Sequence, residues 1–165
     1  MHTVIRKATC ADIPQILAFI RALAEYEHLS HAVQLSAEDL ERDGFGPRPY
    51  FECLIAEANG QPTGYALYFF NYSTFLGKPG IYLEDLFVFP ELRGKGVGKA
   101  LLGRVAAEAV SRNCGRFEWS VLDWNEPAID FYRSQGGEFL NEWRIVRVAG
   151  EALTRLAAAN GEVSR

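Results

Sequence analysis

The feature that most constrains the fold is a glycine-rich run between an apolar strand pattern and a long helical pattern. Three glycines fall within five residues of the run Arg93–Lys99. The stretch Ile81–Phe89 before it is nearly all apolar, and apolar residues recur at helical spacing from Val97 to about Arg112. This order predicts a strand, a tight loop and a helix. A further strand at Arg116–Leu122 would lie parallel to the first, through a right-handed crossover.

The glycine-rich run also indicates a function. Each glycine inside a helix costs about 1 kcal/mol relative to alanine, so three of them near a helix start suggest that a ligand approaches the backbone. Unpaired N–H groups and the positive dipole end of a helix bind phosphate, and Arg93, Lys95 and Lys99 add charge. The spacing after Gly98 breaks a Rossmann fingerprint, and Arg93 and Ala100 occupy positions where a P-loop needs glycine and Ser or Thr.

The rest of the chain alternates strand and helix patterns, with no linker or repeat. Strands are expected at Thr3–Lys7, Cys53–Ala58, Thr63–Tyr72, Glu138–Leu140 and Arg144–Val148. Helices are expected from about Asp12 to Ala24, from Ser36 to Gly44, from Asn125 to Gly136 and over Glu151–Ala159. Asn59-Gly60 predicts a hairpin turn, and Ser73–Gly80 a long loop. The expectation is a single α/β domain over residues 1–165, with a core at about 3–148, a mixed and mostly antiparallel sheet flanked by helices, and a frayed tail.

Composition excludes several classes of protein. With 48% hydrophobic and 23% charged residues, the chain is neither disordered nor a small disulfide scaffold. A net charge of −4 argues against a nucleic-acid partner. The sequence contains no run of about 20 apolar residues, so no membrane span is expected. Three unpatterned cysteines and no secretory signal favour reduced thiols in the cytoplasm. The histidines complete no zinc set, so no metal is expected.

Several stretches together resemble one family. They are VIRKATCAD, LAEYE, DGFG, YLEDLFVFPELRGKGVG and VLDWNEPAIDFY, and the R-x-x-G-x-G pattern lies in the fourth. The chain resembles the GCN5-related N-acetyltransferases (GNAT), and within them the diamine (spermidine/spermine) and thialysine N-ε-acetyltransferases. The resemblance implies the GNAT fold, acetyl-CoA as co-substrate, and a homodimer with acceptor sites near its interface.

The resemblance also implies roles for particular residues. The coenzyme would contact the backbone of Leu86, Phe87 and Val88, the pyrophosphate loop Arg93, Gly94, Lys95, Gly96, Val97, Gly98 and Lys99, and the stretch Asn125, Glu126, Pro127 and Ala128. Tyr132 would point at its sulfur. The amine site would be lined by Tyr26, Glu27, Glu84 and Glu142.

Elementary chemistry supports two catalytic candidates. An alkyl ammonium has a pKa near ~10.4, so about one molecule in a thousand is free amine at pH 7. Glu84 in its apolar strand can attract the cation and accept its proton; the alternative is a strand-end salt bridge. Asp85 is the weaker candidate because alternation places it on the opposite face. Tyr132 can protonate the departing thiolate; the alternative is plain core packing.

The acceptor is expected to be small. The diamine enzymes carry Asp and Trp in the loop that here reads Tyr72-Ser73-Thr74-Phe75, so a carboxylate is missing at Ser73. This departure favours thialysine, lysine, ornithine or a short diamine over long polyamines. Trp143 after Glu142 is expected at an interface or in the core. The alternatives are polyamines, a protein lysine, an antibiotic amine, or a non-catalytic acyl-CoA-binding module.

Overall fold

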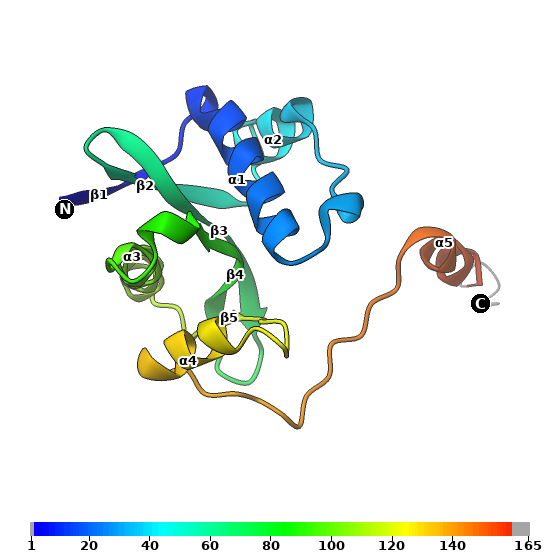
Figure 1. Cartoon of the computed structure of the whole chain (residues 1–165). Helices are drawn as coiled ribbons and strands as arrows, with labels where there is room; N and C mark the ends of the chain where they lie inside the picture. The colour runs from blue at the N-terminus through cyan, green and yellow to red at the C-terminus, as the bar shows by residue number, and fades with distance from the viewer. Residues whose placement is uncertain (1, 160–165) are drawn as a thin grey trace. The chain divides into compact units, whose positions relative to one another are not determined.

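The computed structural model describes residues 2–159, which are coloured along the chain in Figure 1. The expected fraying beyond Ala159 lies outside the described residues. The chain divides into two compact units, Met1–Asn125 and Glu126–Arg165. Each unit is described by itself.

The first unit is built on a five-stranded sheet. Its strands are β1 (Thr3–Lys7), β2 (Glu52–Ala58), β3 (Gln61–Ser73), β4 (Lys78–Val88) and β5 (Arg116–Trp119), and they lie side by side in chain order. The first three pairs are antiparallel, and β4 and β5 are parallel. The predicted mixed, mostly antiparallel sheet is therefore confirmed, as is the parallel pair across the glycine-rich run.

Three α-helices flank this sheet: α1 (Ile13–Tyr26), α2 (Ala37–Gly44) and α3 (Val97–Ser111). A 3₁₀ turn at Cys10–Asp12 precedes α1, and others lie at Ser30–Ala32 and Pro90–Leu92. The hydroxyl of Ser36 accepts from the N–H of Asp39 at 3.1 Å, and Asp39 accepts from the N–H of Ser36. This reciprocal cap is the reason why α2 begins where the sequence predicts.

The sheet is covered on both faces, with α1 and α2 on one side and α3 on the other (Figure 1). Under α1, Phe19 stacks on Tyr65 with ring centres 5.2 Å apart and planes at 4°. On α3, the buried residues repeat at helical spacing: Val97, Leu101, Leu102, Val105 and Ala109. Burial on both faces explains why β3 and β4 read as nearly continuous apolar runs.

The two hairpins test the turn predictions. Asn59 and Gly60 have φ of 52° and 74°, so the predicted turn with two positive φ values joins β2 to β3. The predicted loop Ser73–Gly80 is too long, because Lys78 pairs with Ser73 and continues the ladder. Only residues 74–77 turn.

The second unit contains α4 (Glu126–Ser134) and α5 (Gly150–Ala159), close to the two predicted helices. The predicted strands Glu138–Leu140 and Arg144–Val148 are wrong for this structure, because neither has a ladder partner among the described residues. Apolar side chains there, such as Ile145 and Val146, are exposed. Trp143 was expected at an interface or in the core; its side chain is 75% exposed, so it is not in the core, and the interface stays a prediction.

Candidate active site

The middle of β4 carries a β-bulge. Tyr68 is opposite Leu83, but its neighbour Leu67 is opposite Asp85, so Glu84 is an extra residue in the strand. A bulge bends the strand and breaks the alternation of faces. Alternation predicts Asp85 on the face opposite Glu84 only in a regular strand, so that prediction does not apply across the bulge. Glu84 itself is exposed, so its carboxylate is accessible from solvent.

Asp85, the residue after the bulge, is held by a hydrogen bond. The Tyr65 hydroxyl donates a hydrogen bond of 2.8 Å to its Oδ2. Burial raises the pKa of Asp85 to about 6, although the Tyr65 hydrogen bond lowers it and the charges of Glu84 and Glu27 raise it further. Burial also holds the pKa of Tyr65 well above its usual value, so Tyr65 remains a neutral donor.

Glu27 brings a third carboxylate to this region from the end of α1. It is half-buried, and burial raises its pKa. The charges of Glu27 and of the adjacent Glu84 both act on Asp85, so the three residues are called the carboxylate cluster, with Asp85 at its centre. The repulsion between neighbouring carboxylates is reduced when a cation binds beside them or when one of them takes up a proton. Among residues 2–159, no group of three His, Cys, Asp or Glu side chains is arranged to hold a metal ion.

Aromatic side chains border the carboxylate cluster. The Tyr26 hydroxyl donates to Asn125 Oδ1 at 3.1 Å, and its ring centre lies 6.2 Å from that of Trp124. The His28 ring lies 5.8 Å from Trp124, and His28 has a positive φ of 61°. Trp124 is 48% exposed, so an aromatic wall faces solvent beside Glu27.

The strand edge beyond the bulge is open. β5 pairs with Gly80–Leu83 only and ends there, so no strand of the described chain covers β4 from Glu84 to Val88 on that side. The N–H of Phe89 donates to Thr63 on β3 at 3.1 Å. Since peptide groups alternate in direction along a strand, those of Leu86 and Val88 point to the open edge, as an added strand would need.

The glycine-rich loop follows directly. Gly94 and Gly96 have φ of 72° and 85°, and a Cβ on either would meet no atom within 4 Å, so the loop surface is open. Gly96 precedes the first turn of α3 and has no side chain to cap it. The N–H groups of that turn are thus available to an anion. Lys95 and Lys99 are exposed beside them.

The remaining predicted residues lie in the second unit. Tyr132 is buried on α4, with its ring centre 5.3 Å from that of Phe131. Glu126 and Pro127 are exposed in the first turn of α4, Ala128 is half-buried, and Glu142 is exposed. Asn125, at the end of the first unit, is buried.

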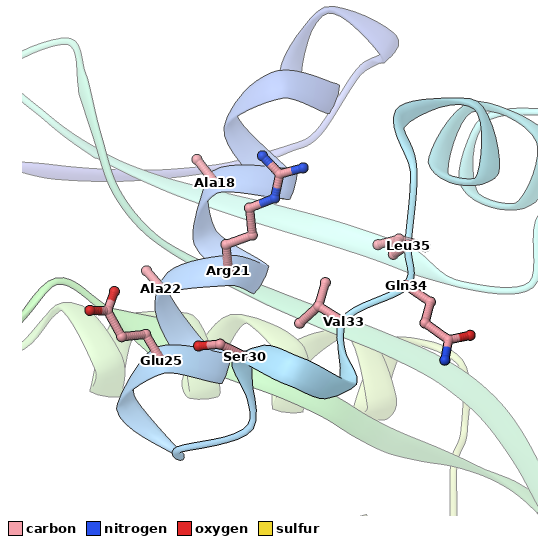
Figure 2. A pocket seen from close by; sticks show the side chains of 8 residues that line it. All are labelled: Ala18, Arg21, Ala22, Glu25, Ser30, Val33, Gln34 and Leu35. Carbon is pink, nitrogen blue, oxygen red and sulfur yellow. The ribbon is translucent and has the colours of Figure 1, made fainter.

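A separate groove of about 530 Å³ lies along α1 (Figure 2). Its lining is Ala18, Arg21, Ala22, Glu25, Ser30, Val33, Gln34 and Leu35. None of these is a predicted site residue, and its polar side chains Arg21, Glu25, Ser30 and Gln34 are all exposed. The groove has no buried polar group that would select a ligand.

Comparison with known proteins gives the family. Residues 15–136, about three quarters of the chain, match the Acetyltransferase (GNAT) family. The chain belongs to the GNAT acetyltransferases. As an acetyltransferase it shares 46% identity over 164 residues with a thialysine N-epsilon-acetyltransferase of Sus scrofa, covering 93% of this chain and 96% of that protein.

Another relative of this GNAT enzyme is named for a different small basic amine. An L-ornithine N5-acetyltransferase of Arabidopsis thaliana is 41% identical over 131 residues, covering 79% of this chain and 54% of that protein.

Among solved structures, an integron cassette protein of V. cholerae has a TM-score of 0.79 and 27% identity, covering 95% of this chain and 98% of that one. An aminoglycoside acetyltransferase at 19% identity and a TM-score of 0.72, covering 90% and 95% of the two chains, shares the fold.

The residues of this GNAT chain fit acetyl-CoA. The N–H and C=O of Leu86 and the N–H of Val88 match an amide-bearing arm, whereas the Val88 carbonyl accepts from Arg93 Nε at 3.0 Å. The uncapped start of α3 with Gly94 and Gly96 matches a pyrophosphate. Burial raises the pKa of the Cys53 thiol, so Cys53 is a poor nucleophile. No helix among residues 2–159 is both long and apolar enough to cross a bilayer.

Sequence reasoning ranked Asp85 below Glu84 and did not identify its partner Tyr65. The available signal was a pair of adjacent carboxylates in an apolar strand, where each ionisable group is costly unless paired or used. Alternation was a sound rule for a regular strand, but a single-residue bulge leaves no mark in the hydrophobic pattern.

Proposed function

We propose that this GNAT acetyltransferase transfers an acetyl group from acetyl-CoA directly to the primary amine of a small basic molecule, such as thialysine, lysine, ornithine or a short diamine. The observation that carries this proposal is the cluster of Glu27, Glu84 and Asp85 beside the open edge of β4. Three carboxylates attract an alkyl ammonium, and the names of the relatives are in accord with such acceptors.

Acetyl-CoA supplies an activated acetyl thioester. Leu86, Phe87 and Val88 hold its pantetheine arm along the open edge, and the loop Arg93–Lys99 holds its pyrophosphate. Asn125–Ala128 contribute further coenzyme contacts. These residues orient the thioester and so reduce the entropy cost of bringing two substrates together.

Glu84 removes the proton of the ammonium, directly or through water, so that the nitrogen lone pair forms the new amide bond. Tyr132 donates its proton to the sulfur as the carbon–sulfur bond breaks, and the second proton that the nitrogen loses on forming the amide returns to Tyr132 through water. The products are the acetylated amine, a free thiol and the proton held by Glu84, which passes to solvent. Tyr26, Glu27 and Glu142 line the acceptor site. Asp85 adds negative charge beneath Glu84.

Ser73 supports a short acceptor. Its hydroxyl is buried and accepts from the N–H of Leu76 at 3.2 Å. Its ladder partner Lys78 is six residues before Glu84, about 20 Å along a strand at roughly 3.3 Å per residue. A short amine bound at Glu84 therefore does not contact Ser73 of the same chain, and no carboxylate there is needed.

We further propose a cytoplasmic homodimer with no nucleic-acid, membrane or metal partner. Exposed apolar residues at Tyr72, Phe75, Ile145 and Val146 support self-association. Sedimentation equilibrium should give twice the chain mass, and a single-chain mass at all concentrations would contradict the dimer.

The test of the proposed function is thiol release from acetyl-CoA, with and without each candidate amine. Amine-dependent release is expected for the short basic acceptors. Stabilisation by CoA without turnover on any amine would identify a non-catalytic acyl-CoA-binding module instead.

A further inference from the structure

The side chain of Arg93 contacts the end of β4 and Tyr26, a residue of the proposed amine site. Its Nε donates to the carbonyl of Val88 at 3.0 Å. The guanidinium carbon lies 4.3 Å from the ring centre of Tyr26 and 5.7 Å from that of Phe87. These contacts place the planar guanidinium between the end of β4 and the end of α1, where a contact with Tyr26 was not expected from the sequence.

Tyr26 is thereby fixed from two directions. Arg93 covers one face of its ring, and Asn125 accepts from its hydroxyl at 3.1 Å. The next residue is Glu27, whose half-buried carboxylate acts on Asp85. One guanidinium thus links the glycine-rich loop to the carboxylate cluster through a single residue of α1.

We propose that Arg93 is a positioning residue for the amine acceptor: its guanidinium holds Tyr26, and through it Glu27, beside the bulge of β4. This role rests on the proposed function. Arginine is required here because a planar guanidinium can stack on an aromatic ring while its Nε donates to a carbonyl, and a lysine ammonium offers no such plane.

The conservative variant Arg93→Lys separates this role from phosphate binding, since it keeps the positive charge and loses the stack. We expect the KM for thialysine, measured at saturating acetyl-CoA, to rise three- to tenfold in Arg93→Lys, a larger change than that in the Kd for CoA, measured by calorimetry without amine. Lys99→Gln in the same loop should show the opposite split, with weaker CoA binding and an unchanged amine KM at saturating acetyl-CoA. Weaker CoA binding with an unchanged amine KM in Arg93→Lys would overturn the proposal.

A second measurement tests the path through Tyr26. In a Tyr26→Leu background the ring is gone, so Arg93→Lys should raise the amine KM no further. Equal effects of Arg93→Lys in the two backgrounds would overturn the proposal even if one variant is less stable. Wild-type activity tests the proposed function separately, because a wild type that acetylates no amine contradicts that function. If the wild type is active but Arg93→Lys weakens CoA binding and leaves the amine KM unchanged, only the role of Arg93 is contradicted.

Discussion

At the scale of single residues, Asp85 retains a proton at a pH where an ordinary aspartate has lost it. Its pKa is raised from 3.8 to about 6, chiefly by burial. Between these values the folded chain binds a proton that the unfolded chain releases. The contribution of this group to the free energy of unfolding is therefore fully present below about pH 4 and is lost as the pH rises through 6.

The isosteric variant Asp85→Asn can still accept from Tyr65 and cannot titrate. We expect wild type to lose stability relative to Asp85→Asn between pH 4.5 and pH 7.5 in urea denaturation. Other carboxylates titrate in both proteins, so the difference isolates Asp85. An identical pH dependence in the two proteins would show that Asp85 ionises normally.

Substitutions of the two proposed catalytic residues should change the kinetics in different ways. Glu84→Gln removes a proton acceptor and a charge that attracts the ammonium, so kcat should fall and the amine KM should rise. Higher pH should partly restore activity, because it supplies free amine. The readout is the pH profile of kcat/KM for the amine.

Tyr132→Phe is the matched comparison. It keeps the buried ring and loses only the hydroxyl, so kcat should fall about 10²-fold with little change in acetyl-CoA binding. It should gain no more from high pH than wild type does. Retention of most of the wild-type kcat in a chemistry-limited assay would make Tyr132 a packing residue.

At the scale of elements, the junction between β4 and α3 is the proposed coenzyme-binding site. Gly96→Asp places a side chain and a negative charge where the pyrophosphate is proposed, so the affinity for acetyl-CoA should fall more than tenfold, about 1.4 kcal/mol. Gly60→Asp is the control, because Gly60 also has a positive φ and open space around it. Equal CoA affinity in the two folded variants would refute the assignment of the loop.

Elements defined by local chemistry were predictable from the sequence. Asn59-Gly60 requires positive φ values, and Ser36 with Asp39 forms a reciprocal cap, so both were found in place. Features defined by tertiary partners were not predictable. The bulge at Glu84 depends on the register with β3, and the stack of Arg93 on Tyr26 joins residues 67 positions apart. The apolar pattern of Arg144–Val148 predicts a strand, but a strand also needs a partner.

At the scale of the whole molecule, the choice of acceptor follows from where negative charge lies. Glu84 and Asp85 lie at the bulge of β4 and the charge of Glu27 acts on Asp85, while the neutral Ser73 at the end of β3 pairs with Lys78 at the start of β4. Ser73→Asp should lower the KM for spermine and leave the KM for thialysine unchanged, with Ser73→Asn as the uncharged control. An equal effect of the aspartate and asparagine variants would show that charge at this position plays no part.

The most direct test of the account compares kcat/KM for thialysine, ornithine and spermine by thiol release from acetyl-CoA, using the unmodified protein. The carboxylate cluster beside the open strand edge predicts amine-dependent release, with thialysine or ornithine preferred over spermine by at least about tenfold, a difference of about 1.4 kcal/mol. A preference for spermine would contradict the proposed acceptor class, and no release with any amine would contradict the proposed function.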